Sequence, residues 1–321
     1  MTDATGRGIR IGLDIGGTKI AGLALADDGT RLASIRRPTG WGDADVLGGA
    51  VAAGAELIDR LGAAGQSIRS IGIGIPGLVD ATQGVVLHAV NLGVASLRLG
   101  EHVRDALGIP CFVENDVKAA ALGAASLRPG SLPMAYLNLG TGVAAGLIIG
   151  GRIWRGARGT AGEVGHLVVD PQGRVCGCGQ RGCIETLCGG GALSRAWGRG
   201  GELPVRDILD AADAGDPSAV GLRHDLFRGA AAAVRALVLS ADVETVVIGG
   251  GLTALGSRVE PGIRAQLRRE ADRSPFLQSL RLDERIELLP ADSAVASIGA
   301  ALLSSAHAEN DPLEKEIPVH G

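Results

Sequence analysis

The chain has 321 residues and a formal net charge of −4 at pH 7, so it has no general electrostatic attraction to nucleic acid or to an anionic membrane. We therefore expect neither as a partner. Its length suffices for two domains of ordinary size, no apolar run is long enough to cross a membrane, and no secretory segment is recognisable. These features predict a cytoplasmic protein.

Glycine is abundant, with 52 residues, whereas aromatic residues make up only 2% of the chain. The glycines gather at the ends of predicted strands, where turns that bind phosphate need them. We expect a ligand site built from backbone amides, carboxylates and amide side chains rather than from aromatic stacking.

The first half of the chain alternates predicted strands and helices. Residues 9–15 and 19–25 are apolar strands joined by a turn at Gly16–Gly17, and Asp28–Gly29 is a further hairpin turn. The other elements predicted here are a helix at 44–62, a strand at 71–75, a helix at 100–107, a strand at 109–113 and a helix from 116 to 125.

The second half begins with another strand–turn–strand pair, at 134–139 and 143–149. This pair resembles the first hairpin, with Asn138-Leu-Gly140 matching Asp14-Ile-Gly16. The separation is far longer than a solenoid repeat and indicates two duplicated α/β lobes, although chance similarity of two glycine hairpins is the alternative. Two such lobes facing each other would form a cleft, which is a favoured ligand site.

Helices are predicted for most of the remaining chain. They cover most of 189–239, and a strand at 243–248 runs into Gly249–Gly251 before the next helix. The arginine-rich stretch 264–273 is predicted to be a solvated helix face. A closing helix at 292–305 is followed by a frayed tail at 308–321.

The first glycine turn combines groups that suit a nucleotide. Asp14 lies at a strand end, and the turn that follows offers backbone N–H groups, the Thr18 hydroxyl and the Lys19 ammonium. Backbone donors and a lysine suit phosphate oxygens, and an aspartate suits Mg²⁺ or its water shell. The spacing is not that of a Walker motif, and an ordinary turn explains this motif equally well when it stands alone.

Two further glycine turns strengthen the prediction of a nucleotide site. Residues 139–142 form one, and Gly249–Gly251 stands between a strand and a helix, where backbone can approach a nucleotide closely. The candidate residues for binding a nucleotide and its Mg²⁺ are Asp14, Gly16, Gly17, Thr18, Lys19, Thr141, Gly142, Gly250 and Gly251.

The run Glu114-Asn115-Asp116 follows a predicted strand and begins a predicted helix. Asn and Asp are favoured helix caps, which is one interpretation. The other is a catalytic aspartate that accepts a hydroxyl proton, as phosphoryl-transfer enzymes need.

Three cysteines and a histidine have the spacing of a metal site. Cys176, Cys178 and Cys183 follow His166, with glycines between them that let a short knuckle wrap an ion. Three thiolates and one imidazole complete a tetrahedral shell with no open position, which indicates structural Zn²⁺. Buried free thiols are the alternative, and a disulfide is less favoured because the chain has five cysteines.

Together these motifs resemble the ROK family of sugar kinases and related repressors. The resemblance covers nearly the whole chain and implies an α/β, two-lobed, actin-like (ribonuclease-H-like) ATPase fold with an interdomain cleft. It implies an N-terminal lobe of residues 1–125, completed by the C-terminal helix 292–307, and a C-terminal lobe of 126–291 with the zinc knuckle. A homodimer or homotetramer is implied as well. The matching motifs are Asp-Ile-Gly-Gly-Thr-Lys at 14–19, Glu-Asn-Asp at 114–116, Leu-Gly-Thr-Gly at 139–142, Glu-Val-Gly-His at 163–166 and the cysteine run at 176–185.

The resemblance also implies roles for individual residues. Asp116 would be the base for the sugar 6-hydroxyl, and Asp14 would lie near Mg²⁺. His166 would be both a zinc ligand and a sugar contact. The residues that would hold the sugar are Gly77, Asn115, Asp116, Glu163, His166 and Glu185.

We therefore predict an ATP-dependent hexose 6-kinase, with glucose as the first substrate and N-acetylglucosamine or N-acetylmannosamine as the alternative. Polyphosphate is the alternative donor. A repressor of this family needs a DNA-reading helix-turn-helix before the first strand, for which residues 1–8 leave no room. A catalytically inactive sugar sensor is a third interpretation, against which the intact Asp116 argues.

Two departures weaken the case for glucose in particular. Many family glucokinases have a tryptophan shortly after the position of Asn91-Leu92, where this chain has Gly93-Val-Ala-Ser96. Many also have Tyr-Ala-Ser-Gly-Arg after the zinc knuckle, where this chain has Leu187-Cys-Gly-Gly-Gly191.

Overall fold

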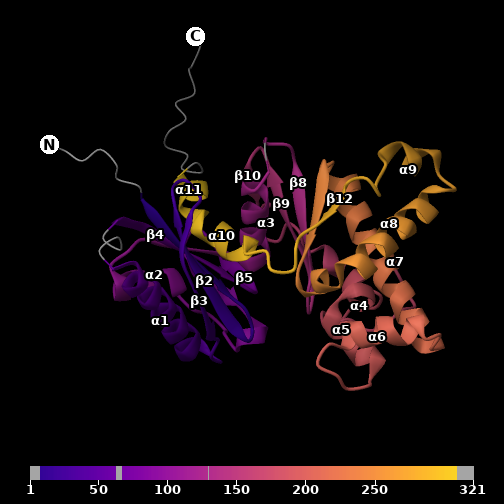
Figure 1. Cartoon of the computed structure of the whole chain (residues 1–321), viewed down its shortest axis with the longest axis horizontal. Coiled ribbons are helices and arrows are strands. Elements are labelled where there is room, and N and C mark those ends of the chain that lie inside the picture. Colours follow the sequence, from indigo (N-terminus) through magenta and orange to yellow (C-terminus); the bar gives the residue numbers. More distant parts are fainter. Residues whose placement is uncertain (1–7, 63–66, 129, 309–321) are drawn as a thin grey trace, which may run out of the picture. The chain divides into compact units, whose positions relative to one another are not determined.

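The computed structural model describes residues 8–62, 67–128 and 130–308 (Figure 1). They form two compact units, of which unit 1 comprises the described residues up to 127 and from 294 onward, and unit 2 comprises the described residues between 128 and 293. Most of the predicted tail, 309–321, lies outside the described residues, and residue 308 ends a helix. None of the helices in the described ranges is long and apolar enough to span a membrane.

Unit 1 is built on a five-stranded sheet of order β3-β2-β1-β4-β7. The first three strands are antiparallel, because short glycine turns join them, and the other two run parallel to β1. Strand β7 begins two residues later than predicted. The strands are β1 (Ile9–Ile15), β2 (Lys19–Ala26), β3 (Arg31–Pro38), β4 (Ile68–Ile75) and β7 (Cys111–Asn115).

Helices cover this sheet, and a small hairpin follows β4. Helix α1 packs with its apolar stripe (Val46, Ala50, Ala53 and Leu57) on the core of unit 1. The predicted closing helix is two helices, α10 and α11, which Figure 1 shows in yellow beside the strands of unit 1. The elements are α1 (Asp43–Leu61), β5 (Leu78–Asp80), β6 (Val85–His88), η2 (Val90–Leu92), α2 (Leu99–Leu107), α3 (Asp116–Ser126), α10 (Val295–Ala301) and α11 (Leu303–Ala308).

Glycines bring α10 into backbone contact with its neighbours. A Cβ added at Gly72 of β4 would lie 1.8 Å from the Ala300 carbonyl oxygen. Equivalent clashes, all below 2 Å, arise on β1, α3 and α10 itself. No side chain fits between these elements, so this packing of α10 requires glycine at these positions. The four positions are Gly12, Gly72, Gly123 and Gly299.

Unit 2 repeats the sheet of unit 1. Its order, β10-β9-β8-β11-β12, has the same sequence of antiparallel and parallel neighbours. This agreement supports the internal repeat inferred from the two hairpins and argues against chance similarity. The strands are β8 (Met134–Leu139), β9 (Val143–Ile149), β10 (Arg152–Trp154), β11 (Thr245–Gly249) and β12 (Ile286–Leu288).

The long helix α7 is central to the core of unit 2 and contributes many of its buried residues. It begins with an Asp216 cap and a proline in the first turn, which together define its start. The helices of unit 2 are η3 (Val164–His166), α4 (Ile184–Cys188), α5 (Gly190–Trp197), α6 (Pro204–Asp213), α7 (Pro217–Ala241), η4 (Gly251–Leu255), α8 (Gly256–Ala271) and α9 (Pro275–Leu280).

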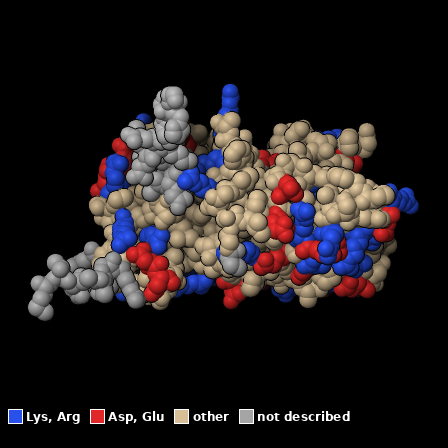
Figure 2. All heavy atoms as spheres, turned by 90° about the horizontal axis from the view of Figure 1, so that it is seen from above, with Lys and Arg blue, Asp and Glu red and all other residues tan. Residues whose placement is uncertain are grey.

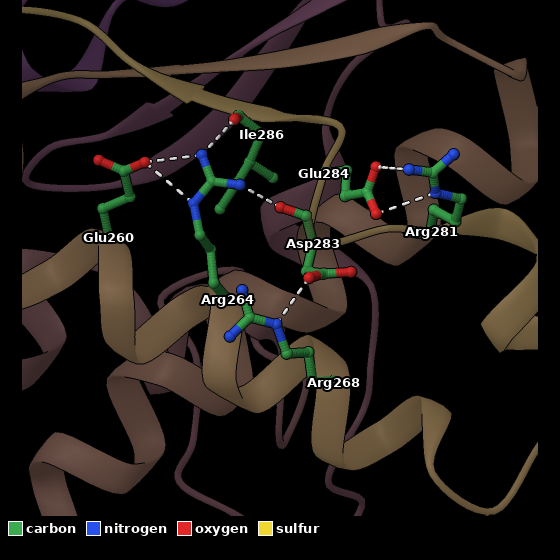
Figure 3. A network of polar contacts seen from close by, with 7 residues as sticks. All are labelled: Glu260, Arg264, Arg268, Arg281, Asp283, Glu284 and Ile286. Atoms are coloured by element: carbon green, nitrogen blue, oxygen red, sulfur yellow. Dashed lines mark hydrogen bonds and ion pairs between the residues drawn. The ribbon is translucent and has the colours of Figure 1, made fainter.

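The arginine-rich stretch on α8 is only partly the solvated face that we predicted. Arg264 is 27% exposed and donates to the Glu260 carboxylate and to the backbone carbonyls of Asp283 and Ile286 (Figure 3). It thus ties α8 to β12. Arg268 is exposed and pairs with Asp283. Acidic and basic side chains are interspersed on the face shown in Figure 2.

The contact at Gly72 can be tested with a matched pair of substitutions. Gly72→Ala should lower the free energy of unfolding by about 3 kcal/mol, because the new methyl group overlaps a backbone carbonyl. Gly48→Ala, on the exposed face of α1 with open space around it, should instead stabilise by up to about 1 kcal/mol. Chemical denaturation measures both. Equal effects of the two substitutions would contradict the close packing of α10.

Candidate functional site

Two carboxylates meet at the carboxyl ends of the parallel strands in unit 1. Asp14 is opposite Gly74 in the β1–β4 register, and Asp116 begins α3 directly after β7. A Cβ at Gly74 would lie 3.4 Å from the Asp116 Cα, so the glycine leaves room for close approach. Burial, and next the charge of Asp116, raise the pKa of Asp14 to about 7, although the Lys19 ammonium lowers it.

Asn115 caps α3 and at the same time holds a loop. Its Oδ1 accepts from the backbone N–H groups of Val117 and Lys118, both at 3.1 Å, and its Nδ2 donates to the Gly77 carbonyl at 3.1 Å. The helix-cap interpretation is therefore correct for Asn115. Asp116, the first residue of α3, accepts from the Val117 N–H at 2.9 Å. Three of the predicted sugar-binding residues thus lie together.

The loop that follows Gly77 folds back onto it. Gly77 has φ +104°, and a Cβ there would lie 2.0 Å from the His88 carbonyl oxygen, at the end of β6. The next residues form a tight loop closed by the Ala89 N–H and the Val94 carbonyl at 2.9 Å. Within it, the Asn91 carbonyl lies 3.6 Å from a Cβ built at Gly17. The loop therefore lies against both Gly77 and the first glycine turn.

Sequence reasoning missed Trp41, a residue between β3 and α1 whose side chain packs against this loop. Its indole ring packs on Gly93 so closely that a Cβ there would lie 2.6 Å from ring atoms, yet the residue is 66% exposed. The neighbouring Gly42 N–H donates to the Leu92 carbonyl at 2.7 Å. The one available signal was a tryptophan between two glycines in a chain that has few aromatic residues.

The first glycine turn exposes the groups predicted to bind phosphate. The Gly16 N–H closes the turn on the Lys19 carbonyl at 2.9 Å, and Gly17, Thr18 and Lys19 are exposed. The Thr18 carbonyl accepts from the Thr39 N–H at 3.2 Å, which anchors the turn to the segment after β3.

In unit 2 the other two glycine turns lie side by side. Gly249 pairs with Asn138 in the β11–β8 register, and a Cβ at Gly250 would lie 2.6 Å from the Asn138 Oδ1. The positive φ of Gly250, +91°, lets the backbone pass at this distance. Thr141 and Gly142 follow β8, which runs parallel to β11, so both turns lie at the same end of the sheet.

Helix α5 begins against the same turn. The Gly190 N–H donates to the Gly140 carbonyl at 2.8 Å, and the Gly191 N–H donates to the Thr141 carbonyl at 2.9 Å. The glycine-rich segment after Leu187, a departure from the family pattern, thus packs on a predicted nucleotide-binding turn.

The predicted metal ligands converge. One ligand atom from each of His166, Cys176, Cys178 and Cys183 lies within 4.8 Å of all the others. The Cys178 and Cys183 sulfurs are 3.7 Å apart, and the Cys176 sulfur is 3.8 Å from the His166 Nδ1. Tetrahedral Zn²⁺ with Zn–S bonds of about 2.3 Å would place two sulfurs about 3.8 Å apart. The donor set and its spacing therefore fit Zn²⁺, and the sulfurs are too far apart for a disulfide.

The three thiols differ in their acidity before any metal binds. The backbone N–H of Gln180, and next its side-chain amide, lower the pKa of Cys178 to about 6. Burial raises the pKa of Cys183 to about 12. A metal ion would displace the remaining protons, because only thiolates are good ligands.

Glu185 connects the cysteine cluster to the turn at 139–142. Its Oε1 is 3.9 Å from the Cys176 sulfur, and its Oε2 accepts from the Val143 N–H at 3.0 Å. A Cβ at Gly142 would lie 2.7 Å from the same oxygen. Glu163 is exposed and directly precedes η3, which carries His166.

The comparison with known proteins decides the family. The model of the ROK family matches residues 10–306. The chain belongs to the ROK family. A glucokinase from Streptomyces coelicolor is 34% identical over 284 residues, covering 82% of this chain and 88% of that protein. An N-acetylmannosamine kinase from Yersinia pseudotuberculosis is 31% identical over 263 residues, covering 80% of this chain and 87% of that protein.

A solved structure of the same family confirms the fold. A ROK family glucokinase from Streptomyces griseus, in complex with glucose and AMPPNP, matches with a TM-score of 0.75 and 31% identity. The match covers 92% of this chain and 99% of that one. The predicted α/β fold of the two-lobed, actin-like ROK kinases is therefore confirmed.

The raised pKa of Asp14 predicts a stability that depends on pH. The pKa of this carboxyl is 3.8 in an unfolded chain and about 7 in the fold. As the pH rises from the first value to the second, the unfolded chain loses this proton more readily than the fold does, so the free energy of unfolding falls. Asp14→Asn should match the wild type at about pH 4 and exceed it by up to about 4 kcal/mol above about pH 7. Thermal unfolding of metal-free protein across this range measures the difference.

Asp59→Asn, at an exposed position of α1, is the matched control and should show no such gain. A stability difference for Asp14→Asn that stays constant with pH would contradict the raised pKa.

Proposed function

We propose that this protein is an ATP-dependent hexose kinase that phosphorylates the 6-hydroxyl of glucose. The observation that carries the proposal is the pair Asp14 and Asp116 at the strand ends of unit 1, in a ROK chain whose relatives are sugar kinases. N-acetylmannosamine or N-acetylglucosamine is the alternative acceptor, and the similarity to an N-acetylmannosamine kinase supports this alternative. The free cysteines fit the proposed cytoplasmic location, where thiols stay reduced.

Asp116 is the proposed general base. It is the first residue of α3, and its carboxylate accepts from the Val117 N–H at 2.9 Å. It would take the proton of the 6-hydroxyl as that oxygen attacks the γ-phosphorus, so that the alcohol becomes the nucleophile. Asn115 and Gly77, which are hydrogen-bonded to each other, would orient the sugar in front of it.

Asp14 fits a cation site, because its half-buried carboxyl lies beside a second carboxylate that a divalent ion would compensate. Mg²⁺ there would neutralise charge on the phosphates. The exposed Gly17–Lys19 segment and the turns around Thr141, Gly142, Gly250 and Gly251 are the proposed ATP-binding groups, through backbone donors and the Lys19 ammonium.

Zn²⁺ is the proposed structural metal of the cysteine cluster. With His166 and three cysteines as ligands the shell is closed, so the ion would not activate water or the 6-hydroxyl. It would fix His166 and, through the Cys176 contact, Glu185. Both residues, with Glu163, are the proposed sugar contacts of unit 2.

A coupled assay over a panel of hexoses and N-acetylhexosamines, with ATP and polyphosphate as donors, tests the proposal. Glucose with ATP should give the highest kcat/KM. A much higher kcat/KM for an N-acetylhexosamine would make that sugar the preferred substrate, and the assignment as a kinase would still hold. Sugar binding without phosphoryl transfer from either donor would indicate a sensor instead.

The role of Asp116 predicts a selective loss of turnover. Asp116→Ala should lower kcat by roughly 100-fold or more, because the 6-hydroxyl loses its proton acceptor, while the sugar KM changes less. Steady-state kinetics measures both, with circular dichroism to establish folding. A folded variant with near-wild-type kcat would show that Asp116 is not the general base and has only a structural role at the start of α3.

The zinc cluster can be tested with two buried cysteines of unit 2. Cys183→Ser should lose the metal and raise the sugar KM more than the ATP KM. Cys188→Ser, also buried but outside the cluster, should keep the metal. Metal analysis and kinetics on the same samples measure both effects. Native protein without stoichiometric zinc would refute the site, and zinc loss with an unchanged sugar KM would refute its link to the sugar.

A further inference from the structure

We propose that the indole of Trp41 forms one wall of the acceptor-sugar site and packs against the apolar C–H face of the bound pyranose. The inference rests on the proposed function, which it extends by naming a residue that selects for the ring form of the sugar. It reverses our expectation that aromatic stacking plays no part in this site.

Trp41 differs from the other two tryptophans of the chain. Trp197 is buried, at 9% exposure, and Arg199 covers its ring at 4.1 Å. Trp154 is 53% exposed on the short strand β10 of unit 2. Trp41 is the most exposed of the three, at 66%, and lies between β3 and α1. Exposure by itself is common on protein surfaces, so the argument depends on how the ring is held.

The ring of Trp41 is fixed on one side by backbone. Gly93 has φ +67°, and its missing side chain lets the indole Cε2 and Nε1 approach to 2.6 Å from where a Cβ would lie. The Gly42 N–H to Leu92 carbonyl bond ties the chain beside Trp41 to the same loop. The indole therefore has one side on a tight loop, while two-thirds of the residue stays open to a ligand.

The loop beneath the indole belongs to the site. Its Asn91 carbonyl lies against Gly17, and the residues just before it pack on Gly77. Gly77 in turn accepts the hydrogen bond from Asn115, the neighbour of the proposed base Asp116. A continuous chain of contacts within unit 1 thus connects the indole with the proposed catalytic carboxylate.

The chemistry of a pyranose matches this arrangement. Its hydroxyls lie around the edge of the ring, where amides and carboxylates such as Asn115 and Asp116 bind them. Its axial C–H groups form a flat apolar face, which an aromatic ring covers with little loss of conformational entropy. An open-chain alditol is equally rich in hydroxyls but has no such face.

Kinetics of three variants tests the wall. Trp41→Ala should raise the sugar KM about tenfold and leave kcat and the ATP KM within about twofold, because the indole contributes binding and no chemistry. Trp41→Phe should recover part of the affinity. Trp154→Ala, which removes another exposed indole from unit 2, should match the wild type. A sugar KM for Trp41→Ala equal to that for Trp154→Ala would overturn the inference.

Fluorescence provides a readout that needs no turnover. Titration of hexose without nucleotide should change the tryptophan emission of the wild type and of Trp154→Phe, but not that of Trp41→Phe. Sorbitol should give no change at equal concentration. If the hexose signal depends on Trp41 while no sugar is phosphorylated, the wall stands and the kinase proposal fails. If the protein phosphorylates hexoses and the signal persists in Trp41→Phe, the kinase stands and the wall is refuted.

Discussion

The backbone contact of α10 with its neighbours is the constraint on which the geometry of unit 1 depends. The helix packs on β1, β4 and α3, and glycines on these elements let its carbonyls approach where no side chain would fit. The same elements carry Asp14, Gly74 and Asp116. A frame closed by backbone has few alternative packings, so the two carboxylates are held by rigid elements rather than by a mobile loop. The end of the chain thus stabilises the site near its beginning.

The duplicated sheets give the two units the same scaffold with different chemistry. Asp14 of unit 1 matches Asn138 of unit 2, at the equivalent place before a glycine turn. An amide there accepts a close backbone neighbour, Gly250, without adding charge. At these strand ends unit 2 therefore has uncharged groups beside its backbone turns, whereas unit 1 has two carboxylates beside its own glycine turn, so the proposed proton and cation chemistry belongs to unit 1.

The sequence predicts those parts of the structure that depend on local pattern. Apolar runs ended by glycine identify β1, β8 and β9, and cysteine spacing identifies a cluster whose ligand atoms do converge. Strands of three residues, such as β10 and β12, carry no detectable period. Arg264 was misjudged and Trp41 was missed for another reason: their partners, the Ile286 carbonyl and Gly93, are distant in sequence and become neighbours only through the fold.

The proposed sugar-binding residues of unit 2 cannot be held in position by core packing, as those of unit 1 are. Residues 167–183 form a knuckle with little apolar core, since Val168, Val169 and Val175 are exposed. Its regular pairing is limited to isolated bridges such as Val168 with Cys183. A segment of this kind buries too little surface to offset the entropy of ordering it. A closed metal shell stabilises such a segment by cross-linking it, and His166, itself a predicted ligand, would then place a sugar contact with the precision that packing alone gives in unit 1.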